Sequence, residues 1–425
     1  MVDAERPDTT PSVPGTADWR RVVAATLKGR GFAALQSRTR DGILIEPLYE
    51  GRSDFPLASM RGSRPWTIVQ SVDDADSDRA NDQALEDVAG GATGLSLNFA
   101  GGPSAKELGL PPSFDAMAAA LDGIDLAAIH IRIEPHPRGP EVARHLKALV
   151  ARGGLAPELA SIAFGLDPIG PSALEVKAID FDADDFVACF GELRQAGFRG
   201  PLAAVDGRVY HEAGASEAQE LAAIMASAAY WLRALDEAGA APDTALPCFG
   251  AGVAADCDQF LSMAKIRATR LLWARLQKIC GAPLAPIPIH ASTSRHMLEI
   301  ADPETNLLRN TIAVAAAGLG GADSILVHDA SPSGVGSRTL SRNIHHLLMD
   351  EAHLHAVIDA ASGSGAVEAL TDSLAERSWA EFQTIEREGG ILASLRAGAF
   401  QARVAEMRLA SGRAPVLNAP AEVIA

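Results

Sequence analysis

The chain of 425 residues carries a formal net charge of −17 at pH 7, which argues against nucleic acid or an anionic membrane as its main partner. A small anionic ligand is not excluded, because it needs only a local patch of arginine and backbone N–H groups. Apolar residues make up 48 % of the chain and charged residues 21 %, so the protein is globular rather than disordered.

An N-terminal extension, residues 1–60, precedes the first predicted strand. Its opening, MVDAERPDTTPSVPGTADW, is acidic and rich in proline, unlike a secretory signal peptide. The residues that follow offer apolar anchors on or beside a helical stretch: Trp19, Val22, Val23, Leu27, Phe32 and Leu35. Anchors of this kind dominate interfaces, so one hypothesis is that the extension contacts a partner subunit. The other is that its helix covers the bottom of the domain that follows.

Eight short apolar runs then alternate with longer segments of helical pattern. Strands buried on both faces read as continuous apolar runs, and long helical crossovers require parallel pairing. Eight such units in about 270 residues are expected of a (β/α)8 TIM barrel. A doubly wound sheet is the alternative, but it usually has fewer strands and often a glycine-rich first turn. The runs lie at residues 66–70, 94–99, 127–133, 161–167, 201–207, 245–251, 286–292 and 323–329.

We therefore predict an α/β protein in three parts: the N-terminal extension (1–60), a (β/α)8 barrel (61–345) and a C-terminal helical segment with a tail (346–425). A helical pattern runs through residues 342–361 and again through 366–398. No stretch approaches the roughly 20 apolar residues of a membrane span. The four cysteines are scattered without a C-x-x-C pair, which predicts reduced thiols, no structural zinc site and a cytoplasmic location.

Polar residues stand at the carboxyl ends of several predicted strands, where barrels carry their chemistry. Asp167, Asp206, His290 and His328 are candidates for acid–base or metal-binding groups. The alternative is that such residues satisfy loop N–H groups and cap the next helices. No spacing signature joins the four residues, so we favour the second interpretation.

Glu134, His136 and Gly139 loosely match the pattern Asp-x-His-x-x-Gly, in which a histidine ligates the cobalt of cobalamin. Two prolines lie inside this match, and it falls between the third predicted strand and its helix rather than in a separate domain. We interpret the match as a coincidence.

Several longer phrases, in chain order from about residue 45 to about 415, resemble the acyl-CoA-binding barrel of the methylmalonyl-CoA mutase family. They are IEPLYEG (45–51), RPWTIVQ (64–70), VYHEAGASEAQELA (209–222), MAKIRATRLLWARL (263–276), DPETNLLRNTIAVAAAGLGGADS (302–324) and the helical stretch at 341–390. The resemblance implies a TIM barrel that handles acyl-CoA.

The family's catalytic residues are replaced. Catalytic subunits read Arg-Pro-Trp-Thr-Ile-Arg-Gln-Tyr on the first strand, where this chain has Val69 and Ser71 in place of the second arginine and the tyrosine. Val209 occupies the position of the histidine that hydrogen-bonds the thioester carbonyl, and His211 aligns with a glutamine. A donor to that carbonyl is worth a few kcal/mol in the transition state, and valine supplies none. The arginine that pairs with a CoA phosphate falls on Pro288, and the segments FGLDPIGPSALE and HDASPSG replace the acyl-CoA and cobalamin contacts.

This pattern is similar to the small, non-catalytic subunit of heterodimeric members of the family. The resemblance implies an adenosylcobalamin-dependent complex that interconverts (R)-methylmalonyl-CoA and succinyl-CoA, with the acyl-CoA chemistry and the cofactor on a large catalytic subunit. It also implies Arg64 and Thr67 as substrate-binding residues, although Arg64 has the alternative role of capping the loop before the first strand. Because the sequence ends after the linker helices, we expect no C-terminal cobalamin-binding domain, unlike the usual small subunit, which keeps a degenerate one.

Two other hypotheses remain open at this stage. One is an active mutase of altered substrate range that uses a separate cobalamin-binding chain. The other is a repurposed barrel, either a CoA-binding regulator or a lyase that uses His290 and Asp206.

Overall fold

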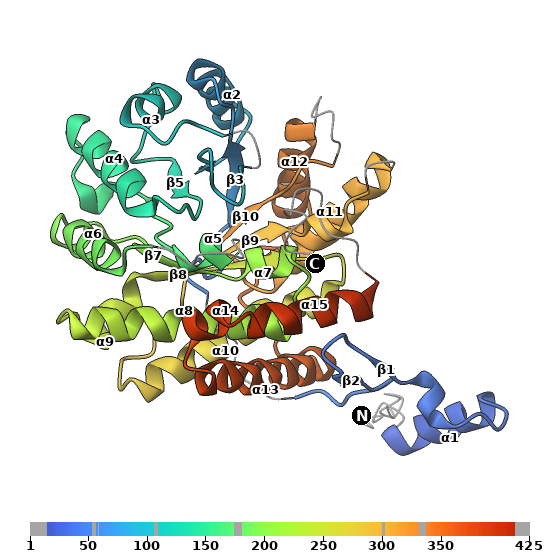
Figure 1. Cartoon of the computed structure of the whole chain (residues 1–425). Helices are drawn as coiled ribbons and strands as arrows, with labels where there is room; N and C mark the ends of the chain where they lie inside the picture. Colours follow the sequence, from blue (N-terminus) through green and yellow to red (C-terminus); the bar gives the residue numbers. More distant parts are fainter. Residues whose placement is uncertain are drawn as a thin grey trace, which may run out of the picture.

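Eight parallel strands form a barrel in the computed structural model, which describes residues 15–52, 57, 59–105, 109–173, 181–299, 302–330 and 337–412 (Figure 1). The strands pair in the order β6-β5-β4-β3-β10-β9-β8-β7. A parallel bridge from Leu166 to Ala203 joins the two ends and closes the ring. The strands are β3 (Thr67–Val72), β4 (Gly94–Leu97), β5 (His130–Ile133), β6 (Ile162–Ala163), β7 (Ala203–Asp206), β8 (Phe249–Ala255), β9 (Ile289–Thr293) and β10 (Ser324–Leu326). The predicted (β/α)8 barrel is thus confirmed.

One predicted strand was placed too early in the sequence. The sixth apolar run was expected at residues 245–251, but β8 begins only at Phe249. The preceding residues form two short helical turns, α9 (Pro242–Ala245) and η3 (Leu246–Cys248), each with a proline in its first turn. Proline suits the first turn of a helix and cannot donate to a central sheet ladder, so it moves the start of the strand.

Longer helices surround the strands, and side-chain caps begin most of them. Asp76, Ser113, Asp182, Asp258 and Asp302 each accept a backbone N–H at a helix start, and α8 has a full capping box. The helices are α2 (Ser77–Ala89), α3 (Phe114–Ala120), α4 (Gly139–Arg152), α6 (Ala183–Gln195), α8 (Glu217–Glu237), α10 (Gln259–Ile279), α11 (Pro303–Leu319) and α12 (Ser337–His346), together with the one-turn helices α5 (Ile169–Ala173) and α7 (Arg208–Glu212).

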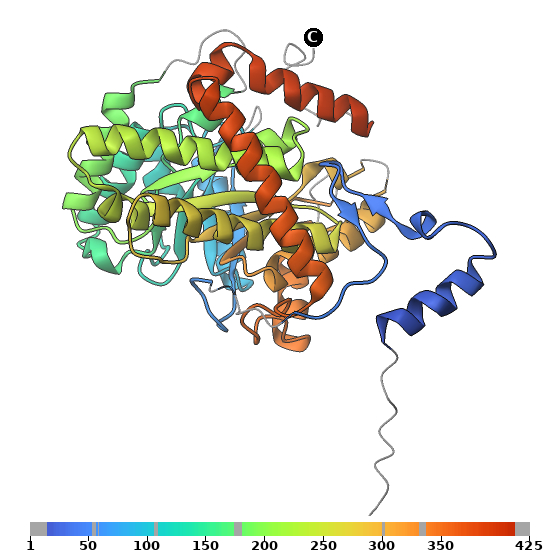
Figure 2. The ribbon, with the colours of Figure 1, turned by 90° about the horizontal axis from the view of Figure 1, so that it is seen from below.

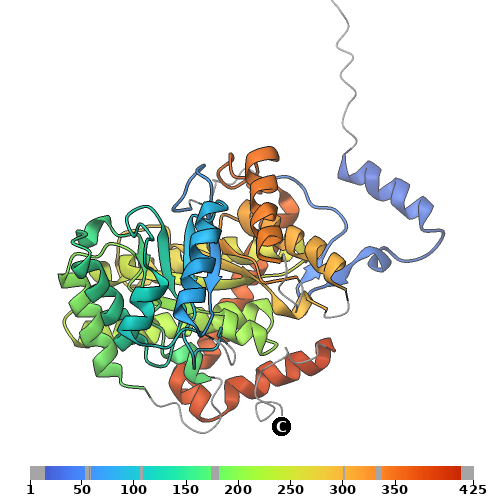
Figure 3. The same ribbon diagram turned by 90° about the horizontal axis from the view of Figure 1, so that it is seen from above.

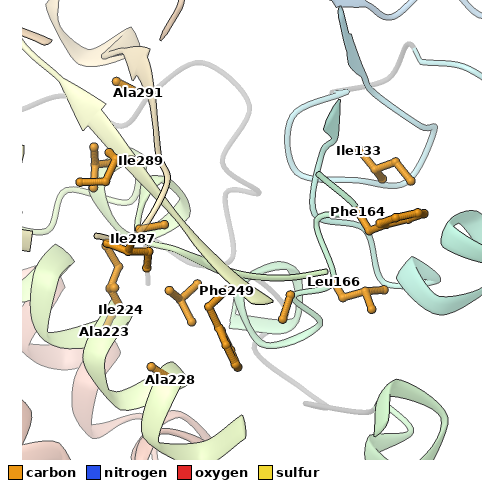
Figure 4. Close-up of a cluster of buried hydrophobic side chains, with 14 of the residues drawn as sticks. Ile133, Phe164, Leu166, Ala223, Ile224, Ala228, Phe249, Ile287, Ile289 and Ala291 are labelled. Atoms are coloured by element: carbon orange, nitrogen blue, oxygen red, sulfur yellow. The ribbon is translucent and has the colours of Figure 1, made fainter. Parts of the chain in front are cut away.

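The main core lies between the strands and these helices. Ile133, Phe164 and Phe249, on or next to the strands, belong to one buried apolar cluster, in which Ala223 and Ile224 of α8 lie beside Ile287 (Figure 4). Because successive strand side chains alternate between two faces, every second residue of each strand faces the barrel interior instead.

In the described residues three helices follow the barrel, α13 (Gly365–Arg387), the short α14 (Ile391–Arg396) and α15 (Ala399–Ser411), and α13 packs along α8 and α10 (Figure 2). The helix predicted through residues 342–361 is only partly present, because it ends in a π-turn, η5 (Leu347–Glu351). A non-helical segment follows, in which Asp359 has a φ of 49°. The buried Arg267 holds it by pairing with Asp359 at 2.9 Å and with Glu368 at 2.8 Å, so tertiary ion pairs override the helical pattern there.

The N-terminal arm, defined here as residues 15–35, stands away from the barrel (Figures 2 and 3). It contains α1 (Thr16–Thr26), which has no buried residue, and η1 (Phe32–Leu35). The rings of Trp19 and Phe32 meet edge to face with centroids 5.8 Å apart, and Leu27 is buried. The arm therefore has a small apolar cluster of its own.

A hairpin of β1 (Ser37–Arg38) and β2 (Leu44–Ile45) connects the arm to the barrel. Its tip is anchored at the start of α8. Arg40 donates to Glu217 at 2.7 Å and to the carbonyl of Ala215 at 3.2 Å. Asp41 accepts hydrogen bonds from the Ser216 hydroxyl and from the backbone N–H of Ala218. Burial, and then the negative charge of Glu217, raise the pKa of Asp41 to about 6.

We expect Asp41→Asn to strengthen this anchor at pH 8. A carboxyl whose pKa is raised by folding stabilises the folded state when protonated, so the anchor should lose stability as the pH rises from about 4 to about 6 and stay constant above. Asparagine removes the charge, accepts the Ala218 N–H with Oδ1 and donates from Nδ2 to the Ser216 hydroxyl, so it should recover up to about 3 kcal/mol locally. Hydrogen exchange of residues 37–45 at pH 8 measures this, with the exposed Asp18→Asn as control. Equal protection in wild type and Asp41→Asn would contradict it.

Candidate functional site

The interior of the barrel is polar. Inward-facing strand positions carry Ser96, Arg132, Glu134, Asp206 and His290, each at most 5 % exposed. Their inward neighbours on β8 are glycine and alanine, and a Cβ at position 252 would collide with the Asp206 carboxylate. Barrel interiors are more often filled by bulky branched residues, so this interior is unusual in holding charges.

Two arginines and two carboxylates form ion pairs with one another in the interior. We call this group the lumen cluster: Arg132, Glu134, Asp206 and Arg208. Glu134 accepts from Arg132 Nε at 3.1 Å on one oxygen and from Arg208 on the other. Asp206 accepts from Arg208 Nε at 2.9 Å and lies 3.5 Å from Arg132. The Ser96 hydroxyl adds a 2.6 Å hydrogen bond to Glu134. The cluster thus joins β5 to β7 across the interior.

The lumen cluster is electrically balanced. Burial alone would raise the pKa of Glu134, but Arg208 and Arg132 hold that pKa well below its usual range, so the carboxylate stays ionised. Burial and the same two arginines lower the pKa of His290 well below its usual range, so this ring is neutral. Its Nδ1 lies 2.8 Å from the Ser324 hydroxyl. Two positive and two negative charges therefore cancel before any ligand is considered.

Asp167, another predicted candidate, holds the backbone of the neighbouring loops through hydrogen bonds to its carboxylate. Burial and the charge of Asp206 raise its pKa to about 7, a perturbation often found in catalytic groups. Both carboxylate oxygens, however, accept backbone N–H groups: those of Ile169 and Gly170 on one oxygen and that of Asp206 on the other, at 3.0 to 3.2 Å. The fourth candidate, His328, lies just beyond β10, where its carbonyl accepts from Asn310 at 2.8 Å.

Arg64 and Thr67 lie at the amino-terminal end of the barrel strands. Asp167 and Asp206 lie at the opposite, carboxyl-terminal end. The Arg64 guanidinium is exposed and donates to the carbonyls of Arg61 and Met60 at 3.1 and 3.2 Å. Thr67 begins β3 and is half-buried. The structure therefore does not bring these two residues together with the lumen cluster.

The structure also places three positions at which we expect catalytic residues of the resembling family to be replaced. Ser71 donates to Asp73 at 3.0 Å and accepts from Asn98 at 2.6 Å. Val69 is fully buried, whereas Val209 lies on α7 and faces a groove outside the barrel interior.

His136, from the loose cobalamin motif, has both ring nitrogens engaged. Nε2 lies 3.0 Å from the carbonyl of Ala100, and Nδ1 accepts from the backbone N–H of Arg138 at 3.0 Å. Among the residues that the structure describes, no group of three or more histidine, cysteine or acidic side chains is arranged to hold a metal ion.

A second buried polar group lies beside α7. His211 Nε2 is 2.7 Å from the Ser294 hydroxyl, and Nδ1 is 3.4 Å from Glu220, which pairs with Lys265 at 2.6 Å. The order serine–histidine–carboxylate is that of a hydrolytic triad. Here, however, all these side chains are completely buried, and Ser294 also accepts the backbone N–H of His296. The group ties α7, α8, α10 and β9 together.

Sequence reasoning did not find Arg132 and Arg208 as partners. The available signal was the stretch HIRIE at residues 130–134, in which charged residues alternate with isoleucines on a buried strand.

Within the ranges described above, no helix is both long and apolar enough to span a bilayer.

Comparison with known proteins identifies relatives of this chain. The family model described as Methylmalonyl-CoA mutase matches residues 201–415. The methylmalonyl-CoA mutase small subunit of Streptomyces virginiae is 35 % identical over 97 % of this chain and 70 % of the relative. The probable methylmalonyl-CoA mutase small subunit of Mycobacterium tuberculosis is 34 % identical over 88 % of this chain and 65 % of the relative. The large subunit from Streptomyces virginiae is 27 % identical over 95 % of this chain and 62 % of that protein. The chain therefore spans about two thirds of each relative.

Proposed function

Because this chain belongs to the methylmalonyl-CoA mutase family, we propose that it is the small, non-catalytic subunit of an adenosylcobalamin-dependent methylmalonyl-CoA mutase. A large subunit would interconvert methylmalonyl-CoA and succinyl-CoA, and this chain would stabilise it by binding. The higher identity to the small subunit than to the large subunit of the same organism supports this assignment.

The observation that carries the proposal is the lumen cluster. A substrate in the barrel interior would have to displace Arg208 from Glu134 and Asp206, leaving two buried carboxylates to share the single charge of Arg132. Breaking a buried pair in this way costs several kcal/mol, which substrate binding would have to supply. The same contacts count against a lyase based on Asp206 and His290, because Asp206 is held by Arg208 and His290 is neutral.

We propose that the partner subunit binds the adenosylcobalamin. The support in this chain is His136, whose two ring nitrogens are already used by Ala100 and Arg138, so the residues of the loose motif do not fit a cobalt ligand. We also propose a cytoplasmic complex, which four cysteines without a disulfide support.

The purified chain should form no succinyl-CoA from methylmalonyl-CoA and adenosylcobalamin, because Ser71 and Val209 replace the reacting groups of catalytic subunits and the lumen cluster fills the interior. A coupled assay of succinyl-CoA formation measures this, and a catalytic large subunit serves as the positive control. Turnover by the chain alone, in preparations free of large subunit, would refute the proposal. Addition of this chain should instead prolong the activity of the large subunit on heating.

Arg64 and Thr67 remain proposed CoA contacts at the amino-terminal end of the barrel. The exposed guanidinium of Arg64 has a planar fork that suits phosphate, although two carbonyls already accept from it. If the CoA contact exists, Arg64→Ala should abolish the CoA binding heat in titration calorimetry while the melting temperature holds. The equally exposed Arg199→Ala is the control. Unchanged binding in Arg64→Ala, or no binding by the wild type, would leave Arg64 as a loop cap.

A further inference from the structure

A groove outside the barrel interior is lined by residues of the carboxyl-end helices α5 and α7 and of the C-terminal helices α14 and α15. Figure 1 shows where these helices lie. It has an empty volume of about 460 Å³, part of it open to solvent. Its walls are mostly apolar and include Val209, Leu395 and Val404. The rings of Tyr210 and Phe400 meet at one wall with centroids 5.6 Å apart. Small-molecule sites commonly have such an apolar lining, with a few polar groups that fix orientation.

Arg408 of α15 lines this groove without a counter-charge. The residue is only 7 % exposed, and within the described part of the chain its guanidinium, whose nitrogens reach the solvent-accessible surface, has neither a hydrogen bond nor an ion pair. Buried arginines are normally paired, because an unpaired buried charge is costly. The other arginines that are buried in the described residues all donate to carboxylates or carbonyls: Arg61, Arg132, Arg267, Arg270 and Arg342.

The stem of Arg408 is held in place. It lies against Gly214, where a Cβ atom would come within 2.7 Å of the Arg408 Cβ and 2.8 Å of its Cγ. Gly214 has a φ of 105°, which only glycine adopts readily, so the backbone there leaves room for the arginine stem. The stem of Arg408 is therefore fixed beside the groove by the shape of the backbone at Gly214.

A second polar atom in the groove also lacks a partner. Gln401 donates from Nε2 to the carbonyl of Leu395 at 3.0 Å, which fixes the amide. Its Oε1 is buried and accepts no hydrogen bond from the described residues. A buried acceptor left unsatisfied costs free energy that a ligand with an N–H or O–H group would recover.

We propose that this groove binds a small aliphatic carboxylate. The carboxylate pairs with Arg408, because the guanidinium fork matches a carboxylate and such a charge-assisted pair is strong at a largely buried residue. The hydrocarbon chain lies along Val209, Phe400 and Val404, and a hydroxyl or amide on the chain donates to Gln401. This site is separate from the barrel interior, so the chain needs no open lumen to use it.

Titration calorimetry of the full chain with octanoate tests the proposal, with octanol as the uncharged probe. Octanoate should bind at least tenfold more tightly than octanol. Arg408→Met keeps the stem against Gly214 and removes the charge, so it should weaken octanoate binding about 10- to 100-fold and leave octanol unchanged. The matched control is Arg396→Met, which removes an exposed charge from α14 without touching the groove.

A melting measurement and a second variant separate loss of binding from loss of folding. Without ligand, Arg408→Met should melt at or above the wild-type temperature, because it removes an unpaired buried charge. If this variant does not fold, Ala405→Trp, at a half-exposed position of the groove wall, leaves Arg408 in place and should abolish binding by filling the space. Equal binding of octanoate and octanol, binding that survives both variants, or no binding of octanoate by the wild type would overturn the proposal.

Discussion

Arg208→Met is expected to lower the free energy of unfolding by about 3–5 kcal/mol, because it leaves the buried Glu134 and Asp206 with one arginine, Arg132, for two carboxylates. Methionine approximates the length of the arginine stem, so little packing is lost and the effect reports on charge. Urea unfolding followed by circular dichroism measures it. Arg138→Met, which breaks an exposed pair with Glu141, is the control and should change stability by less than about 1 kcal/mol.

A double variant separates charge from shape. If Arg208 stabilises by neutralising the carboxylates, Arg208→Met combined with Asp206→Asn should recover part of the loss, because one unpaired charge is removed with the other. Losses that simply add would show that the pair is not coupled. An Arg208→Met protein as stable as the wild type would mean that the barrel interior accepts the change by admitting water, and the closed lumen would no longer support a non-catalytic role.

Removal of residues 1–35 is expected to reduce binding to a large subunit strongly while leaving the chain's own unfolding transition nearly unchanged. The arm has the exposed apolar residues Val22 and Leu35, and α1 buries nothing against the barrel (Figure 3). A deletion to residue 40 would also remove Arg40 of the hairpin anchor, so the cut belongs before β1. Co-purification and sedimentation of the two chains measure the binding, and thermal melting of the truncated chain alone measures its folding.

A pair of point variants provides the matched test of the arm. Val22 is 62 % exposed on the arm, and Leu159 is 63 % exposed on the barrel, so aspartate at either position should be tolerated by the fold. Only Val22→Asp should weaken the complex, because a charge in an apolar interface is costly. A truncated chain that fails to fold, or equal effects of the two variants, would show that the arm serves its own barrel and that the interface lies elsewhere.

The barrel was predictable because its strands are buried on both faces and its crossovers are long, so each strand shows as an apolar run between helical patterns. Two local predictions were wrong because other interactions determine the backbone there. Prolines delay the start of β8, and the ion pairs of Arg267 hold residues 352–364 out of a helix. The division at residues 60 and 345 remains a proposal, in which the hairpin anchor and α13 connect the parts.

The interior was harder to predict than the fold. Sequence patterns identified polar strand ends, including Asp206 and His290, but gave no partners for them. Arg208 and Glu134 are 74 positions apart, and only closure of the barrel brings them together. The groove at Arg408 was not foreseen either, since an arginine in a helix ordinarily points to solvent. Its lack of a partner becomes visible only when the packing of α15 is known.

The lumen cluster constrains how this sequence can diverge. Replacement of any one of Arg132, Glu134, Asp206 or Arg208 leaves an odd buried charge, whereas exchange of an acid and a base together restores neutrality. A double change must pass through a single substitution, and either single substitution leaves an unbalanced buried charge. The four positions should therefore change rarely one at a time. Lineages descending from this barrel should keep the set intact or replace it in opposite-charge pairs, and a return to an open channel would require several coordinated substitutions rather than one.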